Sequence, residues 1–247
     1  MGFEILYQTG QQRYYEQAIS NVAYFENAEQ IVADFCVDME SVSVNCVATL
    51  KGHTSSVAAC VIIPDSSTIV SASADKSLKL WNIESTTCIG TMIGHDNQVN
   101  SCDVTADGSI IVSASSDKLL KLWDIGTTSC ITSLIGHLGI VKDCAVIPNK
   151  QAIVSVSHFN TVKLWDIRTG QCVTTFETHE DYLNACAVTP DGETFITASK
   201  DGSLKLWNVD TGRCLNTFLS PRDSILACAV TPDGSTIVST TPRGVKL

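Results

Sequence analysis

The sequence repeats with a period of 42 residues, and this repeat restricts the possible folds more than any other feature. Histidines, tryptophans and cysteines all return at this interval along the chain. The series are His53, His95, His137 and His179; Trp81, Trp123, Trp165 and Trp207; Cys60, Cys102, Cys144, Cys186 and Cys228; and Cys46, Cys88, Cys130, Cys172 and Cys214. A fixed period of this length indicates an array of similar structural units.

Each period contains four short segments that favour β-strands. They are rich in Val, Ile, Thr and Ser, and turn-forming pairs such as Pro64-Asp65 and Ala74-Asp75 separate them. In the first period the segments are residues 57–63, 68–73, 77–82 and 87–93. One four-stranded antiparallel sheet is too small to bury both of its faces, so neighbouring sheets must stack around an axis. The pattern therefore predicts an all-β fold that closes into a ring.

Four in-phase copies of a second pattern carry a family resemblance. In the first copy, Gly52-His53 is followed by Lys79-Leu80-Trp81-Asn82, and the later copies end in Trp123-Asp124, Trp165-Asp166 and Trp207-Asn208. From about residue 44 to residue 247 the chain resembles the WD-repeat β-propeller family. The resemblance implies a β-propeller of four-stranded blades whose rims and central channel bind other proteins, usually without catalysis.

We expect a propeller at residues 42–247. Its blades are residues 53–94, 95–136, 137–178 and 179–220, and a fifth made of residues 221–247 together with 42–52. Residues 44–50 are in phase with the fourth strands, so their pairing with residues 244–247 would close a five-bladed ring and remove two exposed sheet edges. The alternative is an open fragment of a seven-bladed propeller, since the sequence stops two positions before the tryptophan expected in its last third strand.

Residues 1–41 form an N-terminal extension with a different pattern. Apolar residues recur near a helical period between residues 11 and 37, and this run lacks glycine and proline. They are Ala18, Val22, Phe25, Val32 and Phe35. The pattern predicts an amphipathic helix that packs on the propeller or binds a partner.

Charge and composition exclude several classes of function. The chain has 26 acidic and 16 basic residues, a formal charge of −10 that disfavours a nucleic-acid partner. No stretch is apolar enough for a membrane-spanning helix, and no secretion signal begins the sequence, so we expect a cytoplasmic protein without membrane contact. The cysteines form no C-x-x-C pair, and we expect reduced thiols with no metal and no cofactor.

The family resemblance implies a structural hydrogen-bond network inside each blade, formed by a His, a Ser or Thr, an Asp and a Trp. The matching residues are His53, Asp75 and Trp81; His95, Asp117 and Trp123; and His179, Asp201 and Trp207. A Ser-His-Asp catalytic triad is disfavoured because the same set recurs in three blades, whereas a reaction needs one site. Blade three has Phe159 in place of the carboxylate, which should leave His137 and Trp165 short of a partner, and blade five has Pro221 and Arg243 at the His and Asp positions.

Loop positions in blades three and four gather apolar residues that other blades lack. We expect this surface to bind a protein or peptide. The candidate partner-binding residues are Leu138, Ile140, Lys142, His158, Phe159, Glu180, Tyr182 and Lys200.

The sequence therefore favours a non-enzymatic interaction module, a scaffold or a substrate-recognition propeller that binds a protein segment at the channel-side loops. The alternative is a sensor or regulatory WD-repeat segment of a larger signalling protein. An enzyme such as a propeller hydrolase is disfavoured because the sequence has no phosphate-binding Gly-rich loop, no H-E-x-x-H and no G-x-S-x-G motif. The sequence does not indicate the oligomeric state.

Overall fold

The computed structural model of the chain describes residues 2–7, 45–64, 66–177, 179–220 and 223–247. All regular elements within these ranges are β-strands, which confirms the all-β prediction for this part of the chain. The predicted helix at residues 11–37 lies outside the described ranges, and so does most of the N-terminal extension. A membrane-crossing helix is not found in the described part of the chain.

Four complete blades follow one another, each an antiparallel sheet of four consecutive strands. Blade one contains β3 (Val57–Ile62), β4 (Thr68–Ser73), β5 (Ser77–Asn82) and β6 (Thr87–Ile93), and blade two contains β7 (Val99–Val104), β8 (Ile110–Ser115), β9 (Leu120–Asp124) and β10 (Ser129–Leu134). Blade three contains β11 (Val141–Ile147), β12 (Ala152–Ser157), β13 (Thr161–Asp166) and β14 (Cys172–Glu177), and blade four contains β15 (Leu183–Val188), β16 (Thr194–Ser199), β17 (Ser203–Asn208) and β18 (Cys214–Leu219).

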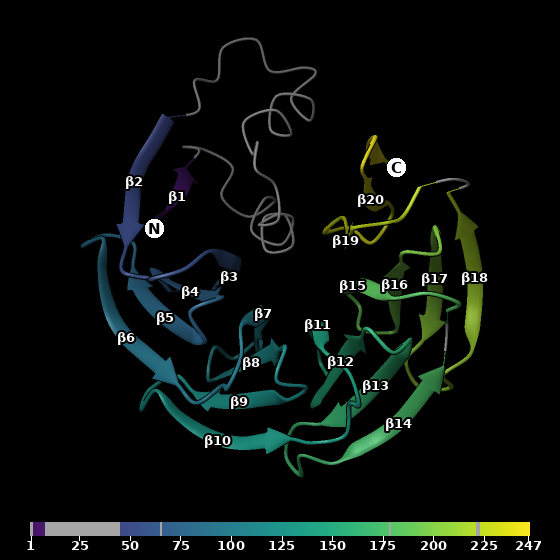
Figure 1. The fold of residues 1–247 in the computed structure, drawn as a ribbon, viewed down its shortest axis with the longest axis horizontal. Helices are drawn as coiled ribbons and strands as arrows, with labels where there is room; N and C mark the ends of the chain where they lie inside the picture. Colours follow the sequence, from purple (N-terminus) through teal and green to yellow (C-terminus); the bar gives the residue numbers. More distant parts are fainter. Residues whose placement is uncertain (1, 8–44, 65, 178, 221–222) are drawn as a thin grey trace.

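The blades are arranged around a central axis (Figure 1). The first strands β3, β7, β11 and β15 face this axis, and the fourth strands β6, β10, β14 and β18 form the outer wall. The second strands are buried at every position after the first, and the third strands have half-buried positions among buried ones, whereas the outer strand β18 is exposed along its whole length. This arrangement places the turns between strands at the two ends of each blade, where partners can reach them.

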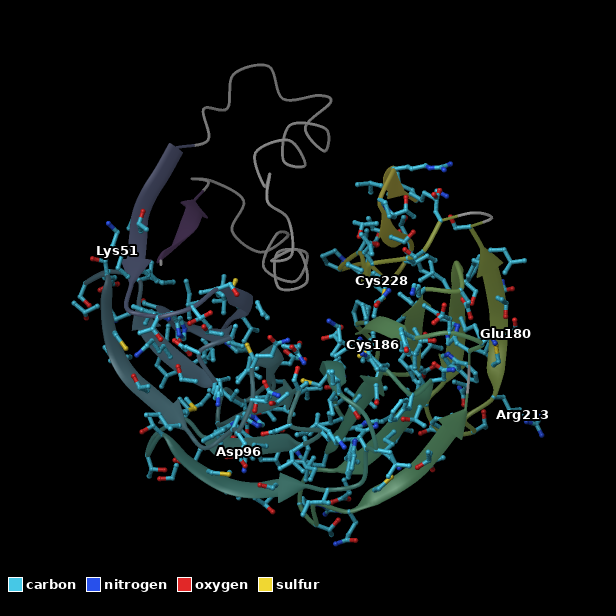
Figure 2. All side chains as sticks on the ribbon, viewed as in Figure 1. Lys51, Asp96, Glu180, Cys186, Arg213 and Cys228 are labelled. Carbon is cyan, nitrogen blue, oxygen red and sulfur yellow. The ribbon has the colours of Figure 1, made fainter. Side chains whose placement is uncertain are left out.

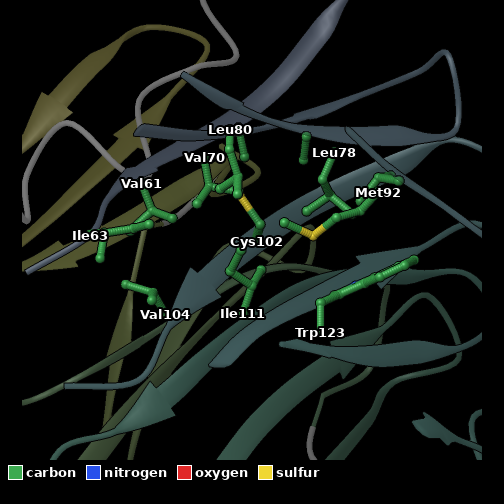
Figure 3. Packing of buried hydrophobic residues seen from close by; sticks show 13 residues of the cluster. Val61, Ile63, Val70, Leu78, Leu80, Met92, Cys102, Val104, Ile111 and Trp123 are labelled. Atoms are coloured by element: carbon green, nitrogen blue, oxygen red, sulfur yellow. The ribbon is translucent and has the colours of Figure 1, made fainter. Parts of the chain in front are cut away.

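The hydrophobic core consists of layers between successive blades. In the layer between blades one and two, Trp123 packs with Leu78 and Met92 (Figure 3). Trp165 and Leu134 meet in the next layer, and Trp207 stacks on Phe176 in the one after. The repeated tryptophan thus fills the gap between its own blade and the preceding one, which explains why one large aromatic is needed per repeat.

The repeated cysteines fall into two environments. Those of the first strands lie toward the interior, as Cys186 and Cys228 do in Figure 2, and burial raises the pKa of the Cys60 thiol to about 11. The fourth-strand residues Cys88, Cys130, Cys172 and Cys214 are exposed thiols on the outer wall. The prediction of reduced thiols agrees with these residues, but the small apolar core role applies only to the first-strand series.

The remaining described strands lie at the two ends of the array. At the N-terminal end, β1 (Gly2–Tyr7) pairs with β2 (Asn45–Lys51). At the C-terminal end, β19 (Ala227–Val230), β20 (Ile237–Thr241) and β21 (Gly244–Lys246) form a three-stranded sheet. Among the described residues, β2 pairs with β1 and the strands form an open arc (Figure 1), so closure of a five-bladed ring by residues 44–50 and 244–247 stays a prediction.

Candidate functional site

A buried hydrogen-bond network connects the second and third strands of blade one to the loop before its first strand. The indole N–H of Trp81 donates to Ser71 Oγ at 2.7 Å, and the Ser71 hydroxyl lies 2.7 Å from His53 Nε2. His53 Nδ1 lies 2.7 Å from Asp75 Oδ2. With a neutral imidazole protonated at Nδ1, every group in the chain has a partner: Trp donates to Ser, Ser donates to His, and His donates to Asp.

The same geometry recurs in blades two and four, at the residues matched to the structural network. His95 Nδ1 lies 2.7 Å from Asp117, and His179 Nδ1 lies 3.1 Å from Asp201. The hydroxyls are Ser113 and Thr197, which accept from Trp123 at 2.8 Å and Trp207 at 2.9 Å. The backbone N–H after each histidine also donates to the carboxylate, from Thr54, Asp96 and Glu180. The network thus fixes the loop at the channel-side end of each blade.

Burial and hydrogen bonding set the charge state of these groups. Burial lowers the pKa of His53 and of His179, which keeps the imidazoles neutral. Burial alone would raise the pKa of Asp117, but hydrogen bonds from His95 and from two backbone N–H groups outweigh it and lower the pKa to about 2. The hydroxyl Ser71 is fully buried and already holds both a donor and an acceptor, so it cannot attack a substrate as a triad serine would.

Blade three completes its network with a different residue from the one expected. His137 Nδ1 lies 3.1 Å from Thr161 Oγ1, while Ser155 still bridges His137 Nε2 at 2.7 Å and Trp165 Nε1 at 2.8 Å. The prediction that His137 and Trp165 lack partners is therefore wrong, because Thr161 replaces the carboxylate at the Nδ1 end. Without a negative charge nearby, burial and the Lys163 cation lower the pKa of His137 to about 3.

In blade three, the turn between the second and third strands has an aromatic side chain, Phe159, where blades one and two have a carboxylate. In blades one and two the turn between second and third strands contains Asp75 and Asp117, followed by residues with positive φ, Lys76 at 72° and Lys118 at 75°. The turn of blade three keeps this backbone form, with Asn160 at φ 57°, but Phe159 points outward and is 59% exposed. The backbone of the turn is thus the same in the three blades, but the side chain at the aspartate position is an exposed ring in blade three instead of a hydrogen-bond acceptor.

Several of the predicted partner-binding residues of blades three and four lie in contact with one another or with adjacent loop residues. The Phe159 ring lies against Gly139, next to the exposed Leu138, and the His158 ring stacks on Tyr182 with centroids 4.9 Å apart. Lys200 Nζ lies over the Tyr182 ring at 5.4 Å. Lys142 lies close enough to His158 that, together with burial and Lys200, its charge lowers the imidazole pKa. Ile140 is half-buried, and Glu180 is exposed.

Blade five lacks the network and uses ion pairs instead. Arg243 Nε lies 3.2 Å from Asp223 Oδ1, and Lys246 Nζ lies 3.7 Å from Asp223 Oδ2. Pro221, at the histidine position, lies outside the described residues. The Arg243 and Lys246 side chains are exposed, so solvent screens their attraction to Asp223, and these pairs hold the turn less firmly than the buried networks of the other blades.

Two carboxylates in the channel wall were missed by the sequence reasoning. Asp143 accepts hydrogen bonds from the backbone N–H of Cys186 in blade four at 2.9 Å, from its neighbour Cys144 at 2.9 Å, and from the Ser101 hydroxyl of blade two. Asp103 accepts from the N–H of Val146 in blade three at 2.7 Å. Asp143 therefore connects three consecutive blades. The sequence repeat could have indicated Asp143, because it is the only carboxylate at a repeat position that otherwise has small residues. These equivalents are Ala59, Ser101, Ala185 and Ala227.

Asparagine side chains make similar connections. Asn100 Nδ2 donates to the carbonyl of Val141 in the next blade at 2.7 Å, and Asn184 Nδ2 donates to that of Ile225 at 2.7 Å. This repeat position therefore forms a contact with the next blade at both asparagines.

Asp143 gives the first testable prediction, a pH dependence of stability. Burial raises the pKa of Asp143 to about 6, above its ordinary value near 3.8, so the folded chain holds this proton more tightly than the unfolded chain. The free energy of unfolding of the wild type, relative to Asp143→Ala, is therefore expected to fall by about 3 kcal/mol as the pH rises from about 4 to about 6, and to stay constant above. Urea denaturation of both proteins at several pH values measures this difference.

A suitable control is Asp107→Ala. Hydrogen bonds from Thr105 and Ser109 lower the pKa of the exposed Asp107. The free energy of unfolding of the wild type, relative to Asp107→Ala, should therefore rise with pH instead of falling. A wild-type to Asp143→Ala difference that does not vary with pH would contradict the assignment of a raised pKa.

The described residues offer no group of three or more His, Cys, Asp or Glu side chains arranged to hold a metal ion. The features that remain are the repeated networks, the channel-wall carboxylates and the exposed surface of blades three and four.

Comparison with known proteins agrees with the repeated geometry. The family model described as WD domain, G-beta repeat matches residues 44–82, 86–124, 128–166 and 170–208. Each match runs from the fourth strand of one blade to the third strand of the next and ends just after the buried tryptophan. A search of curated proteins finds none that matches the chain. Propellers of this family commonly mediate contacts between proteins. With four copies of the repeat covering more than half of its length, the chain belongs to the WD-repeat family.

Proposed function

We propose that this chain is a non-enzymatic interaction module that binds a protein segment on the channel-side surface of blades three and four. We call this surface the aromatic patch and define it as Leu138, Ile140, Lys142, His158, Phe159, Glu180, Tyr182 and Lys200. The observation that supports it best is the replacement of a buried network carboxylate by the exposed ring of Phe159. A scaffold or substrate-recognition role follows from binding of this kind.

The exposure of the patch favours a protein partner. Leu138 is 76% exposed, Phe159 59% and Tyr182 44%, and the three lie on adjacent loops of two neighbouring blades. Such a cluster of apolar and aromatic side chains is costly to leave in water, and aromatic anchors dominate the energetics of protein interfaces. The His158 and Tyr182 rings already stack on each other in the unbound chain, which reduces the side-chain entropy lost when a partner docks.

The charges around the patch indicate the chemistry of the bound segment. Lys142 and Lys200 flank His158, whereas the whole chain carries a net charge of −10. A segment with an apolar residue beside one or more carboxylates would place its apolar side chain on Phe159 and its negative charge near the lysines. The overall negative charge also supports a protein partner over a nucleic acid. The thiols on the outer wall suit a reducing compartment such as the cytoplasm.

Selection from a phage-displayed peptide library on the immobilised protein tests this proposal. The selected peptides should share an apolar or aromatic residue next to Asp or Glu. Replacing both Phe159 and Tyr182 by alanine should weaken binding of a selected peptide at least about tenfold, measured by fluorescence anisotropy, because both anchors are removed. The thermal melting curve should stay close to that of the wild type, because both side chains are exposed.

The matched control is Ile131→Ala with Val173→Ala, which removes exposed apolar side chains from the outer wall. This variant should bind the peptide with unchanged affinity. If the control weakens binding as much as the Phe159 and Tyr182 double variant, or if the double variant binds like the wild type, the aromatic patch is not the binding surface.

A further inference from the structure

His158 is the one histidine of the chain that lies outside the 42-residue series. The chain has five histidines, and the other four are the network residues that precede the first strands of blades one to four. The residues at the equivalent position of the other blades are Ala74, Ser116, Lys200 and Pro242. The repeat therefore does not require an imidazole at this position.

The imidazole of His158 has no hydrogen-bond partner among the described residues. His53, in contrast, is bonded at both ring nitrogens, Nδ1 to Asp75 and Nε2 to Ser71. The His158 side chain is half-buried, and its backbone N–H donates to the carbonyl of Ile140 at 3.0 Å. A neutral imidazole has one donor and one acceptor nitrogen, so both are available to a bound molecule.

Stacking on Tyr182 holds the His158 ring in place. The two ring centroids are 4.9 Å apart and the planes differ by 23°. The Lys200 ammonium lies 5.4 Å from the centroid of the same Tyr182 ring, and the Lys200 N–H donates to the Tyr182 carbonyl at 2.9 Å. Since His158 and Lys200 occupy equivalent turns of neighbouring blades, Tyr182 is contacted by the turns of both blades three and four.

The surroundings of His158 oppose a positive charge on its ring. Burial lowers the pKa of His158 below its ordinary value of 6.5, and the charges of Lys142 on β11 and Lys200 on the adjacent turn lower it further. Among the described residues no carboxylate forms an ion pair with His158, whereas His53 pairs with Asp75. The imidazole is therefore neutral at pH 7 in the unbound chain.

A carboxylate bound beside His158 would reverse this balance. Its negative charge would offset the two lysines, and its oxygen would accept a hydrogen bond from a protonated ring nitrogen. Phe159, the next residue in the sequence, is 59% exposed and would contact an apolar side chain of the same segment. The geometry thus places the group that can gain a proton beside the ring that anchors the segment.

We propose that His158 takes up a proton from solvent when the aromatic patch binds an acidic segment, and that the imidazolium donates a hydrogen bond to a carboxylate of that segment. The inference rests on the proposed function, because it concerns the same surface. His158 thereby selects acidic segments and makes their affinity depend on pH.

The direction of the pH dependence follows from the number of protons bound in each state. In the unbound chain the pKa of His158 lies below 6.5, and the carboxylate in the complex raises it. Between these two pKa values the complex holds more protons than the unbound chain, so the affinity rises as the pH falls through this interval. At lower pH both states are protonated, and the affinity stays constant until the carboxylates of the segment titrate near pH 4.

Fluorescence anisotropy of a selected acidic peptide at pH 7.5 and pH 5.5 tests this inference. The dissociation constant of the wild type should be about three- to tenfold lower at pH 5.5, because a difference of one pKa unit between the two states corresponds to a factor of about ten. A peptide whose acidic residues are replaced by their amides should lose most of this pH dependence.

Asp103 and Asp143 titrate in the same pH range, so variants are needed to assign the effect to His158. The pKa of each carboxyl is raised to about 6. His158→Gln keeps a donor and an acceptor but cannot be charged, and its affinity should differ by less than about twofold between the two pH values. His158→Arg is charged at both pH values and should also lose the pH dependence. The matched control is Ala74→His, which places an imidazole on the equivalent turn of blade one and should keep the pH dependence of the wild type.

Proton NMR of the wild type gives a direct measurement that needs no binding by a variant. The His158 Cε1–H signal is assigned by its absence from the spectrum of His158→Gln and is followed against pH with and without the peptide. The apparent pKa should be higher with the peptide by about half a unit or more. An unchanged pKa, or a pH dependence of affinity that persists in His158→Gln, would overturn the inference while binding at the aromatic patch stands. If peptide binding does not depend on Phe159 and Tyr182, the proposed function fails and this inference fails with it.

Discussion

Replacing Trp123 by alanine is expected to lower the free energy of unfolding by about 3 to 5 kcal/mol, the largest effect of any single substitution considered for this chain. The Trp123 side chain is 1% exposed and packs with Leu78 and Met92 of the preceding blade (Figure 3). Its removal opens a cavity between two blades and takes away the N–H that donates to Ser113. A loss of this size is a large fraction of the roughly 5 to 15 kcal/mol that stabilises a typical domain.

Two further variants separate packing from hydrogen bonding. Trp123→Phe keeps an aromatic ring but removes the donor to Ser113, so we expect a smaller loss of about 1 to 3 kcal/mol. Ile131→Ala removes a side chain that is 52% exposed on the outer wall and should change stability by less than about 0.5 kcal/mol. Urea denaturation followed by circular dichroism measures all three. Equal losses for Trp123→Ala and Ile131→Ala would show that the layer between blades one and two contributes little.

Replacing Phe159 by aspartate is expected to stabilise the chain and to abolish partner binding. In blades one and two the carboxylates of Asp75 and Asp117 accept hydrogen bonds from the histidine and from a backbone N–H of the preceding loop. Aspartate at position 159 would offer the same acceptor to His137 and to the N–H of Leu138. We expect a gain of about 1 to 2 kcal/mol, and a melting temperature about 2 to 8 °C higher.

The same substitution should change the acid stability of blade three. The pKa of His137 is about 3, below its ordinary value of 6.5, so the folded chain resists protonation and loses stability as the pH falls below 6.5. A carboxylate beside Nδ1 raises the folded pKa and reduces that loss. The stability advantage of Phe159→Asp over the wild type should therefore grow between pH 7 and pH 5, which urea denaturation at the two pH values measures.

Peptide affinity measured on the Phe159 variants shows whether Phe159 serves partner binding or the fold of blade three. Peptides selected on the wild type should lose affinity for Phe159→Asp even though the variant is more stable, because the exposed ring is gone. Phe159→Asn, which has a similar shape without the charge, should lose binding equally but gain less stability. A variant that loses stability and binding together would indicate that Phe159 serves the fold and not a partner.

Much of the fold could be predicted because the repeat encodes contacts that recur in every blade. The four-strand unit, the blade boundaries and the network residues of blades one, two and four follow from positions such as His53, Asp75 and Trp81, which the sequence presents several times in the same phase. Contacts within a blade and between equivalent faces of neighbouring blades are identical at each step. One correct alignment therefore predicts all of them.

The exceptions to the repeat were harder to interpret. Phe159 was recognised as a departure, but Thr161 was not recognised as the group that would complete the network of His137. Nothing in the sequence indicated that the exposed and buried cysteine series differ, because both keep the same period. The side of the sheet on which each cysteine lies depends on strand position in the blade, which sequence spacing alone does not fix.

The sequence by itself determined what happens once per blade: strands, turns, the aromatic that fills each layer, and the family to which the chain belongs. Only the tertiary structure decided which residues meet across blades, such as Asp143 with Ser101 and the N–H of Cys186, and which strand pairs with β2 at the end of the array. The physical reason is that a periodic sequence specifies local conformation and equivalent neighbours. Contacts between unlike positions, in the channel wall and at the two ends, arise from the curvature that stacking the blades produces.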